Sequence, residues 1–312
     1  SIMPNYQGVW SLSTHYQNRT GWPQAPSLAL FGGGDSDTSI IERLLITSTG
    51  TATDFGTLSV GRERLAGAGN KTRAVFASGY DGSNDTNVMD FISYLSGGTA
   101  SDFGDLTVAR RAAAGNINSS TRAAFSGGGV TKRDTIDYIT IASAGNATDF
   151  GNLTIAREYP AGTCSSTRGV AGGGMNASDT NVNVIDYITI ASVGNSTDFG
   201  NLTVARTQLA ATGSETRGVF AGGINTSNAL VNTIDYITVA SAGNASDFGD
   251  LLATVRAPSG VCDATKAIFN DDGSTSLYAV TIASTGNAVA FGDLTVVNKY
   301  RGGASAAMAA VQ

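Results

Sequence analysis

The chain has 312 residues and a formal net charge of −6 at pH 7, with no basic stripe, which argues against a nucleic-acid partner. Charged residues make up 14% of it, against about 25% in typical soluble domains, so the polar surface must come mainly from serine, threonine, asparagine and glycine. No apolar run approaches the roughly 18 residues of a transmembrane helix, and no signal-peptide pattern is visible. We therefore expect neither nucleic-acid binding nor membrane insertion.

Residues 1–26 stand apart from the rest of the chain because they do not follow its internal repeat. They contain both tryptophans, Trp10 and Trp22, and the single histidine, His15. The segment is too apolar for a free linker. Two interpretations remain open: it packs on the side or base of the following domain, or it docks to a neighbouring subunit. We predict a leader over 1–26 with Trp10 and Trp22 as docking residues, and one repeat domain over 27–312.

An internal repeat fills residues 27–312 and is marked by a phenylalanine in the triplet Asp-Phe-Gly. These phenylalanines, the last of which follows an alanine, are Phe55, Phe103, Phe150, Phe199, Phe248 and Phe291. Their spacing of 43 to 49 residues indicates six copies of one supersecondary unit. Each copy holds four extended segments, and the alternation of side chains over 136–141 is typical of a strand. The sequence predicts an all-β, six-bladed β-propeller with four-stranded blades.

The two ends of the repeat domain complement each other. The first copy begins at Ser27 with what corresponds to its second strand, so its first strand is missing. The segment 301–312 resembles the missing first strand. We predict that the C-terminal strand completes blade one and closes the ring, because closure removes the exposed edges that would otherwise promote aggregation.

Two charged positions recur in nearly every copy. Aspartates precede the repeated phenylalanines at Asp54, Asp102, Asp149, Asp198 and Asp247, and arginines follow at Arg62, Arg110, Arg157, Arg206 and Arg256. A pair of residues repeated in blade after blade predicts a structural hydrogen-bonding device rather than a series of active sites. Cys164 and Cys262 share one repeat position two blades apart, which should exceed the ~7 Å Cα separation that a disulfide allows, so we expect free thiols.

The loops differ between the two expected faces of the propeller. The turn between strands three and four is nearly constant, as in the Gly-Asn turns at Asn146, Asn195 and Asn244, which also match a glycosylation sequon. The loops joining strands two to three and four to one vary in length and content, and variable loops on a rigid scaffold often carry function. We therefore predict a binding face there. Its candidate residues are Tyr80, Asp81, Arg111, Lys132, Arg133, Tyr159, Gln208, Asn225 and Tyr300. The alternative is that these loops vary because nothing constrains them.

The sequence contains few residue patterns that would support catalysis. A Ser-His-Asp triad or a histidine-based metal centre has nothing to build on, because His15 lies outside the repeats. We predict a protein that is not an enzyme, with no catalytic residues and no cofactor. A glycosidase needs only two carboxylates, so a glycan-cleaving enzyme stays open as an alternative. Asp271 and Asp272 are weak candidates for Ca²⁺ binding, although aspartates in solvated turns are the commoner explanation.

The repeat resembles kelch repeats, which carry a glycine pair after the second strand, a tyrosine in the third and a tryptophan in the fourth. Here Gly222-Gly223 and Tyr236 match, Phe248 replaces the tryptophan, and Ala279 replaces the tyrosine of copy six. The repeat segments 216–223 and 232–251, and the leader at Gly8–Leu12 and Trp22–Pro26, are also similar to virion and tail-fibre-like proteins of marine bacteriophages, cyanophages especially. That resemblance implies a virion protein assembled in the host cytoplasm, with other tail proteins and a host-surface glycan or receptor as partners. The alternatives are a purely structural virion subunit and an intracellular kelch adaptor.

Overall fold

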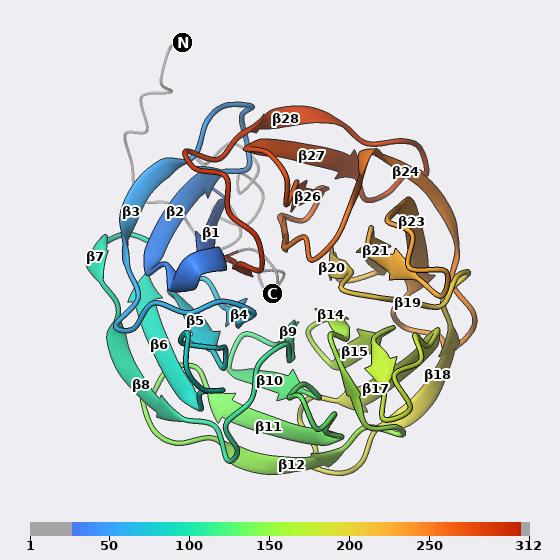
Figure 1. Cartoon of the computed structure of the whole chain (residues 1–312), viewed down its shortest axis with the longest axis horizontal. Coiled ribbons are helices and arrows are strands. Elements are labelled where there is room, and N and C mark those ends of the chain that lie inside the picture. Colours follow the sequence, from blue (N-terminus) through green and yellow to red (C-terminus); the bar gives the residue numbers. More distant parts are fainter. Residues whose placement is uncertain (1–26, 307–312) are drawn as a thin grey trace, which may run out of the picture.

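The computed structural model describes residues 27–306, which form six small antiparallel sheets arranged as a ring around a central axis (Figure 1). The predicted six-bladed β-propeller is therefore confirmed. Within these residues the one helical segment is a 3-10 turn at Asp35–Asp37, and no helix has the length and apolar character needed to cross a membrane. Trp10 and Trp22 lie outside the described residues.

The first three blades are ordered from the axis outward. Blade one consists of β29 (Gly302–Ser305), β1 (Leu28–Gly32), β2 (Ile40–Leu45) and β3 (Thr53–Thr57). Blade two consists of β4 (Ala66–Gly69), β5 (Arg73–Ala77), β6 (Val88–Ser93) and β8 (Ser101–Asp105). Blade three consists of β9 (Ala114–Asn118), β10 (Arg122–Ser126), β11 (Thr135–Thr140) and β12 (Thr148–Asn152). A two-residue strand, β7 (Gly98–Thr99), pairs with the outer edge of β3.

The other three blades repeat this order. Blade four consists of β14 (Ala161–Cys164), β15 (Arg168–Gly172), β17 (Val184–Thr189) and β18 (Thr197–Asn201). Blade five consists of β20 (Ala210–Gly213), β21 (Arg217–Ala221), β23 (Val231–Thr238) and β24 (Ser246–Val255). Blade six consists of β25 (Gly260–Cys262), β26 (Lys266–Asn270), β27 (Ser276–Thr281) and β28 (Val289–Asp293).

The C-terminal strand closes the ring, as predicted. β29 pairs antiparallel with β1, with Ala29 opposite Ser305 and Gly32 opposite Gly302. Blade one thus takes one strand from the end of the described chain and three from its beginning (Figure 1). Strands 270 residues apart in sequence become neighbours, so the ring has no open edge at this blade.

The constant Gly-Asn turns fasten each of blades three to six to the blade before it. Gly194 donates its amide hydrogen to the Phe150 carbonyl at 2.7 Å, and the Asn195 side chain accepts the Asn152 amide at 3.0 Å. Gly151 has a φ of 142°, and a Cβ atom there would lie 2.4 Å from the Gly194 carbonyl oxygen, so any other residue would collide. The same bonds recur at Asn146, Asn244 and Asn287. This structural role explains why the turn repeats so closely.

The repeated arginines are structural, but their partners differ from those expected. Arg62, Arg110, Arg157 and Arg206 are fully buried and pair with aspartates of the third strand, namely Asp90, Asp137, Asp186 and Asp235. The aspartates beside the repeated phenylalanines are exposed instead. Arg256 does not belong to this set, because Val255 occupies the equivalent buried position and Arg256 is displaced toward solvent.

The two cysteines are unpaired, as expected, and both are fully buried in innermost strands. Cys164 donates its thiol hydrogen to the Asn118 carbonyl of the preceding blade at 3.0 Å. Burial raises the pKa of the Cys164 thiol to about 12, which keeps it protonated and unreactive. The cysteines are therefore packing residues.

Candidate functional site

The two sets of variable loops form one continuous surface, which we call the loop face. In blades two, four and five, the linker that enters the blade pairs with the loop between its strands two and three. The strand β13 (Arg157–Glu158) pairs with β16 (Met175–Asn176), and β19 (Arg206–Thr207) pairs with β22 (Ile224–Asn225). Glu63 and Tyr80 form the same kind of bridge in blade two. These main-chain bonds hold the linkers and the variable loops in register around the axis.

One residue in each linker lies at the axis in a left-handed conformation. The six residues are Arg64, Ala112, Tyr159, Gln208, Ala257 and Tyr300, with φ between 47° and 57°. Their main chains bond to one another around the ring: the Arg64 amide donates to the Tyr300 carbonyl, Ala112 to Arg64, Tyr159 to Ala112, and Ala257 to Gln208, at 2.7–2.9 Å. Left-handed backbone is costly for residues other than glycine, so this ring of bonds stabilises a strained conformation and directs the six side chains toward the axis.

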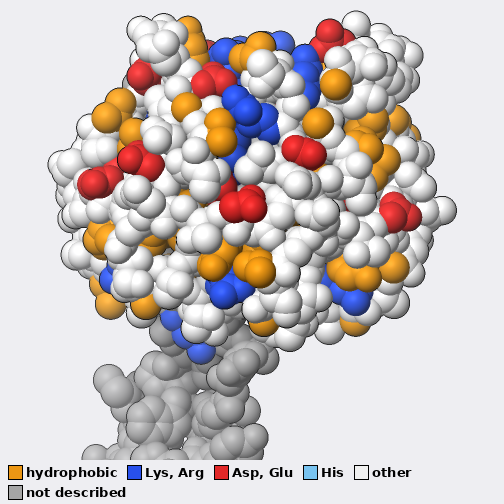
Figure 2. All heavy atoms as spheres, turned by 90° about the horizontal axis from the view of Figure 1, so that it is seen from below, with side chains coloured by type: hydrophobic (Ala, Val, Ile, Leu, Met, Phe, Trp, Pro, Cys, Tyr) orange, Lys and Arg blue, Asp and Glu red, His pale blue; other side chains and the backbone are white. Residues whose placement is uncertain are grey.

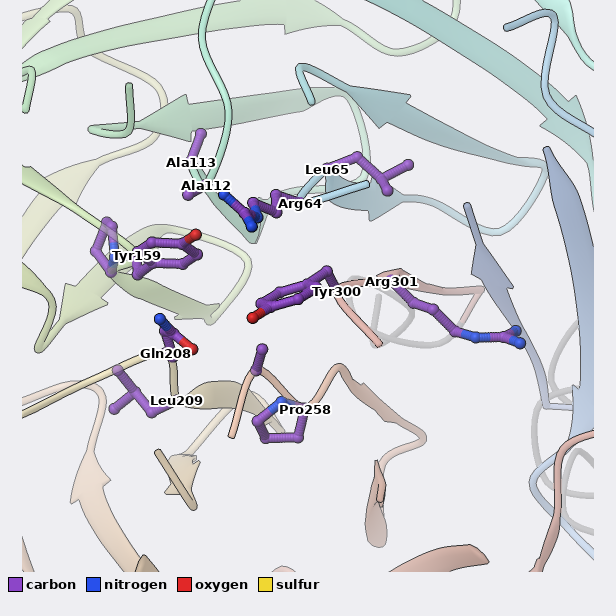
Figure 3. A pocket seen from close by; sticks show the side chains of 12 residues that line it. Arg64, Leu65, Ala112, Ala113, Tyr159, Gln208, Leu209, Pro258, Tyr300 and Arg301 are labelled. Atoms are coloured by element: carbon purple, nitrogen blue, oxygen red, sulfur yellow. The ribbon is translucent and has the colours of Figure 1, made fainter. Parts of the chain in front are cut away.

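These side chains and the residues that follow them line a cavity of about 80 Å³ at the mouth of the central channel, which we call the mouth pocket. The guanidinium of Arg64, the phenol of Tyr159, the phenol of Tyr300 and the amide of Gln208 converge on its centre (Figure 3). Pro160 and Pro258 supply apolar wall. No aspartate or glutamate lines the pocket among residues 27–306.

The polar groups of the mouth pocket are only partly satisfied by one another. The Arg64 guanidinium stacks on the Tyr300 ring at 4.8 Å, and its Nε lies 3.0 Å from Glu63 Oε1 in a salt bridge. Burial raises the pKa of Tyr159 well above its ordinary value, and the nearby Arg64 charge opposes this only in part. The side-chain oxygen Oε1 of Gln208 is buried and finds no hydrogen-bond partner among the described residues. The pocket therefore combines four donor groups, those of Arg64, Tyr159, Tyr300 and the Gln208 NH₂, with one acceptor, Gln208 Oε1, that has no partner among the described residues.

Asn116 closes the channel beneath the mouth pocket. It is an extra residue in β9, with a φ of 56°, and its side chain reaches across the axis to donate to the carbonyls of Ala211 at 3.2 Å and Gly260 at 3.0 Å. The surrounding throat of about 90 Å³ is narrow because the innermost strands meet at small residues such as Gly67 and Gly162. The mouth pocket is thus a cup with a floor rather than the entrance of an open tunnel.

The rim of the loop face carries paired charges around the pocket. Arg111 stacks on the Tyr80 ring at 4.4 Å and pairs with Asp85 at 2.8 Å. Lys132 bonds to Asp179 at 2.5 Å and lies 3.8 Å from Glu158. Seen edge-on, the loop face carries lysine and arginine side chains between two raised groups of loops (Figure 2). Burial raises the pKa of Glu158, and the surrounding cations oppose the rise.

The predicted candidates divide into three groups. Tyr159, Gln208 and Tyr300 meet in the mouth pocket, and Tyr80, Arg111 and Lys132 form the charged rim. The remaining ones serve their own loops. Asp81 accepts the amides of Ser83 and Asn84, Asn225 accepts those of Ser227 and Ala229, and the Arg133 main chain bonds to Gly128 and Arg157.

The weak Ca²⁺ candidates also have partners within the protein. Asp271 accepts hydrogen bonds from the Ser274 hydroxyl and the Tyr278 hydroxyl, and Asp272 pairs with Arg256. Among residues 27–306, no group of three histidine, cysteine, aspartate or glutamate side chains is placed to hold a metal ion. The two aspartates are best explained by the turn that they stabilise.

Sequence reasoning missed two residues of the site. Arg64 lies at the same repeat position as Tyr159 and Tyr300, two residues after the buried arginine position, and aligning the six linkers on that position would have found it. Asn116 is a one-residue insertion that only blade three carries in its innermost strand, so the spacing between Arg110 and Arg122 contained the signal. The side chain's reach across the axis needed the structure.

Comparisons with known proteins add no relative. No protein-family model matches the sequence, and a search of curated proteins found no significant match. The functional interpretation therefore depends on the geometry of the loop face and on the resemblance described from the repeats.

Proposed function

We propose that the protein is a non-enzymatic recognition module of a bacteriophage virion or tail, which binds a host-surface glycan or protein through its loop face. The observation that carries this proposal is the mouth pocket. Six equivalent linker residues share one backbone conformation but differ in side chain, and four of them, Arg64, Tyr159, Gln208 and Tyr300, point polar groups at one centre. A constant backbone with varied, converging side chains is the arrangement of a binding site on a rigid scaffold.

The contrast between the two faces supports the same proposal. On the opposite face, the Gly-Asn turns are committed to bonds between blades, as at Asn195 and Asn244. On the loop face, length and content vary while the main-chain bonds that hold the linkers are kept. The similarity of the repeats to marine phage tail proteins is the reason for proposing that a virion carries this module.

The lining of the mouth pocket supports binding rather than glycan cleavage. Glycoside hydrolysis uses two carboxyl groups that flank the scissile bond, with a separation that depends on the mechanism. The mouth pocket has no aspartate or glutamate in its lining. Glu158 lies nearby on the rim, where Lys132 pairs with it.

A purely structural virion subunit is the second candidate, and the rim favours it. Arg111 pairs with Asp85, and Lys132 pairs with Asp179. A rim of internally satisfied charges would suit a surface that meets other subunits of the particle. The mouth pocket is the feature that this alternative leaves without a role.

The test is adsorption of the full, fluorescently labelled chain to a panel of marine bacterial cells and to surface polysaccharides purified from them. We expect saturable adsorption to at least one strain, and its loss in a Tyr159→Ala/Tyr300→Ala variant whose melting curve is unchanged. Failure to adsorb to any strain, together with association with purified virion subunits, would instead establish the structural role.

A further inference from the structure

We propose that the mouth pocket holds the terminal sugar unit of a saccharide through two adjacent hydroxyl groups, with the Gln208 amide as the central contact. This inference rests on the proposed recognition function and names the ligand chemistry of that same site. It follows from which hydrogen-bonding groups the pocket leaves without partners.

Gln208 requires a ligand that can donate a hydrogen bond. Its Oε1 atom has no donor among the described residues and lies just below the surface of the pocket wall, so a ligand hydroxyl reaches it when the amide turns about its terminal bond. A buried acceptor without a partner destabilises the free protein, so a ligand that supplies the missing hydrogen removes that cost on binding. Carboxylate, sulfate and ionised phosphate groups only accept hydrogen bonds, and they leave Oε1 unsatisfied.

The other converging groups require a ligand that also accepts. The Arg64 guanidinium can only donate, and the phenols of Tyr159 and Tyr300 add two further hydroxyl groups (Figure 3). A sugar hydroxyl donates one hydrogen bond and accepts others, so adjacent hydroxyls can donate to Gln208 Oε1 and accept from its NH₂ group or from Arg64. This combination of an amide, a guanidinium and phenols matches a vicinal diol better than it matches an anion alone.

The shape of the pocket favours the end of a saccharide over its interior. Asn116 closes the throat beneath it, and the six linkers surround it. A saccharide can therefore enter only end-on, with its terminal unit inward and the rest of the chain leaving toward the rim. There Tyr80 and Arg111 form a stacked pair beside the exit. The carbon–hydrogen face of the sugar would rest on apolar wall from Pro160 and Pro258.

Saturation-transfer NMR titrations of the full chain test the proposal with three probes: oligosaccharides ending in a neutral hexose, oligosaccharides ending in a uronic acid, and an acidic peptide. We expect saccharides to bind and the peptide to fail, and the first two probes decide whether the diol alone suffices. Gln208→Met keeps the length of the side chain but removes both hydrogen-bonding functions, so it should weaken binding about tenfold or more. Tyr300→Phe should weaken it less, and the matched control Tyr187→Phe, outside the pocket, should bind as the parent does.

Deoxy saccharides sharpen the test. If Gln208 contacts a particular hydroxyl, removing that hydroxyl should weaken parent binding, and should have little further effect on Gln208→Met, because both changes delete one contact. Additive losses would overturn the proposed contact, and binding of the peptide in place of the saccharides would overturn the ligand class. Cell adsorption that is unchanged in Gln208→Met would overturn the inference while leaving the proposed function standing. Saccharide binding without adsorption to any cell would overturn the function alone.

Discussion

Blade six joins blade five without the buried ion pair that other blades use. At the junction of blades four and five, Arg206 pairs with Asp235 at 3.1 Å, and the Thr203 hydroxyl donates to the same carboxylate at 2.5 Å. At the junction of blades five and six, all three residues are changed together: valine, tyrosine and leucine stand where arginine, aspartate and threonine are expected. These are Val255, Tyr278 and Leu252, and the first two belong to one buried apolar cluster.

This difference teaches what the ion pair does. The buried arginine joins adjacent blades through its main chain as well, because the Arg206 carbonyl accepts the Gly174 amide; Val255 makes the same bond to Gly223. The backbone junction therefore survives without the charges. Burying two charges costs several kcal/mol each before their attraction is counted, so an apolar replacement of both is often neutral, whereas loss of one partner is not.

The junction that closes the ring shows a third arrangement. There Asn298 occupies the arginine position, and the cation comes instead from Arg301, which pairs with Glu42 of β2. The Thr295 hydroxyl donates to the same carboxylate. Because Arg301 immediately precedes β29, the strand that closes the ring also carries the only partner cation that Glu42 has among the salt bridges of residues 27–306.

Removing the closing segment should therefore have the largest effect. Deleting 301–312 removes β29, leaves β1 with an open edge, and leaves the fully buried Glu42 without Arg301. We expect the cooperative thermal transition to be lost, as followed by circular dichroism and calorimetry. A chain that ends at Ala306 keeps β29 and serves as the matched control. A sharp transition in the longer deletion at the parent temperature would show that closure contributes little.

Removing one partner of a buried ion pair should cause the second-largest loss of stability. Asp235→Ala leaves the Arg206 guanidinium, which is fully buried, without its counter-charge, and this should cost about 3–5 kcal/mol in the free energy of unfolding. Urea denaturation measures the change. The exposed Asp198→Ala, at the aspartate position beside the repeated phenylalanine, should change stability by less than about 0.5 kcal/mol and provides the control.

Replacing the whole set should restore most of that loss. Thr203→Leu, Arg206→Val and Asp235→Phe together give the junction of blades four and five the apolar character of the next junction. Phenylalanine is chosen rather than tyrosine because the Tyr278 hydroxyl of blade six donates its hydrogen bond to Asp271. Two guanidinium nitrogens of Arg206, Nε and Nη1, are buried without hydrogen-bond partners, so their removal relieves a cost. We expect the free energy of unfolding of the triple variant to lie within about 2 kcal/mol of that of the parent. A triple variant as unstable as Asp235→Ala would show that the charges themselves hold the junction.

The fold was predictable because its signals repeat. The phenylalanine spacing and the alternation of the third strand indicate six four-stranded units, and the absence of a first strand before Ser27 pointed to closure by the C-terminal segment. The partner of the buried arginine was not predictable in the same way. Two aspartates recur with equal regularity in most copies, and periodicity alone cannot say which of them, Asp198 or Asp235 for example, is buried.

The candidate site was predictable as a face but less so residue by residue. Tyr159, Gln208 and Tyr300 followed from the variability of the linkers, because a linker residue has few structural duties besides its backbone. Asp81 and Asn225 were chosen for the same reason, yet their side chains cap the turns in which they lie. A polar side chain that serves its own loop and one that serves a ligand look alike in sequence.

The smallest expected effect is on the pH dependence of stability, through Tyr278 at the junction of blades five and six. Burial, and next the hydrogen bond to Asp271, raise the pKa of Tyr278 to about 12, from the ordinary value near 10. A raised pKa means that the folded state favours the protonated phenol. Its contribution to stability is therefore fully present below pH 10 and is lost as pH rises from about 10 toward 12, by up to about 1 kcal/mol per pH unit.

Tyr278→Phe removes that titration. Its unfolding free energy, measured in urea between pH 9 and about 11.5, should fall less steeply with pH than that of the parent, because other buried groups contribute equally to both. Asp271→Asn should give an intermediate slope, since it removes the neighbouring charge but leaves the phenol buried. Equal slopes in all three chains would mean that Tyr278 ionises as easily in the folded as in the unfolded state, and that the apolar cluster of blade six does not exclude a charge.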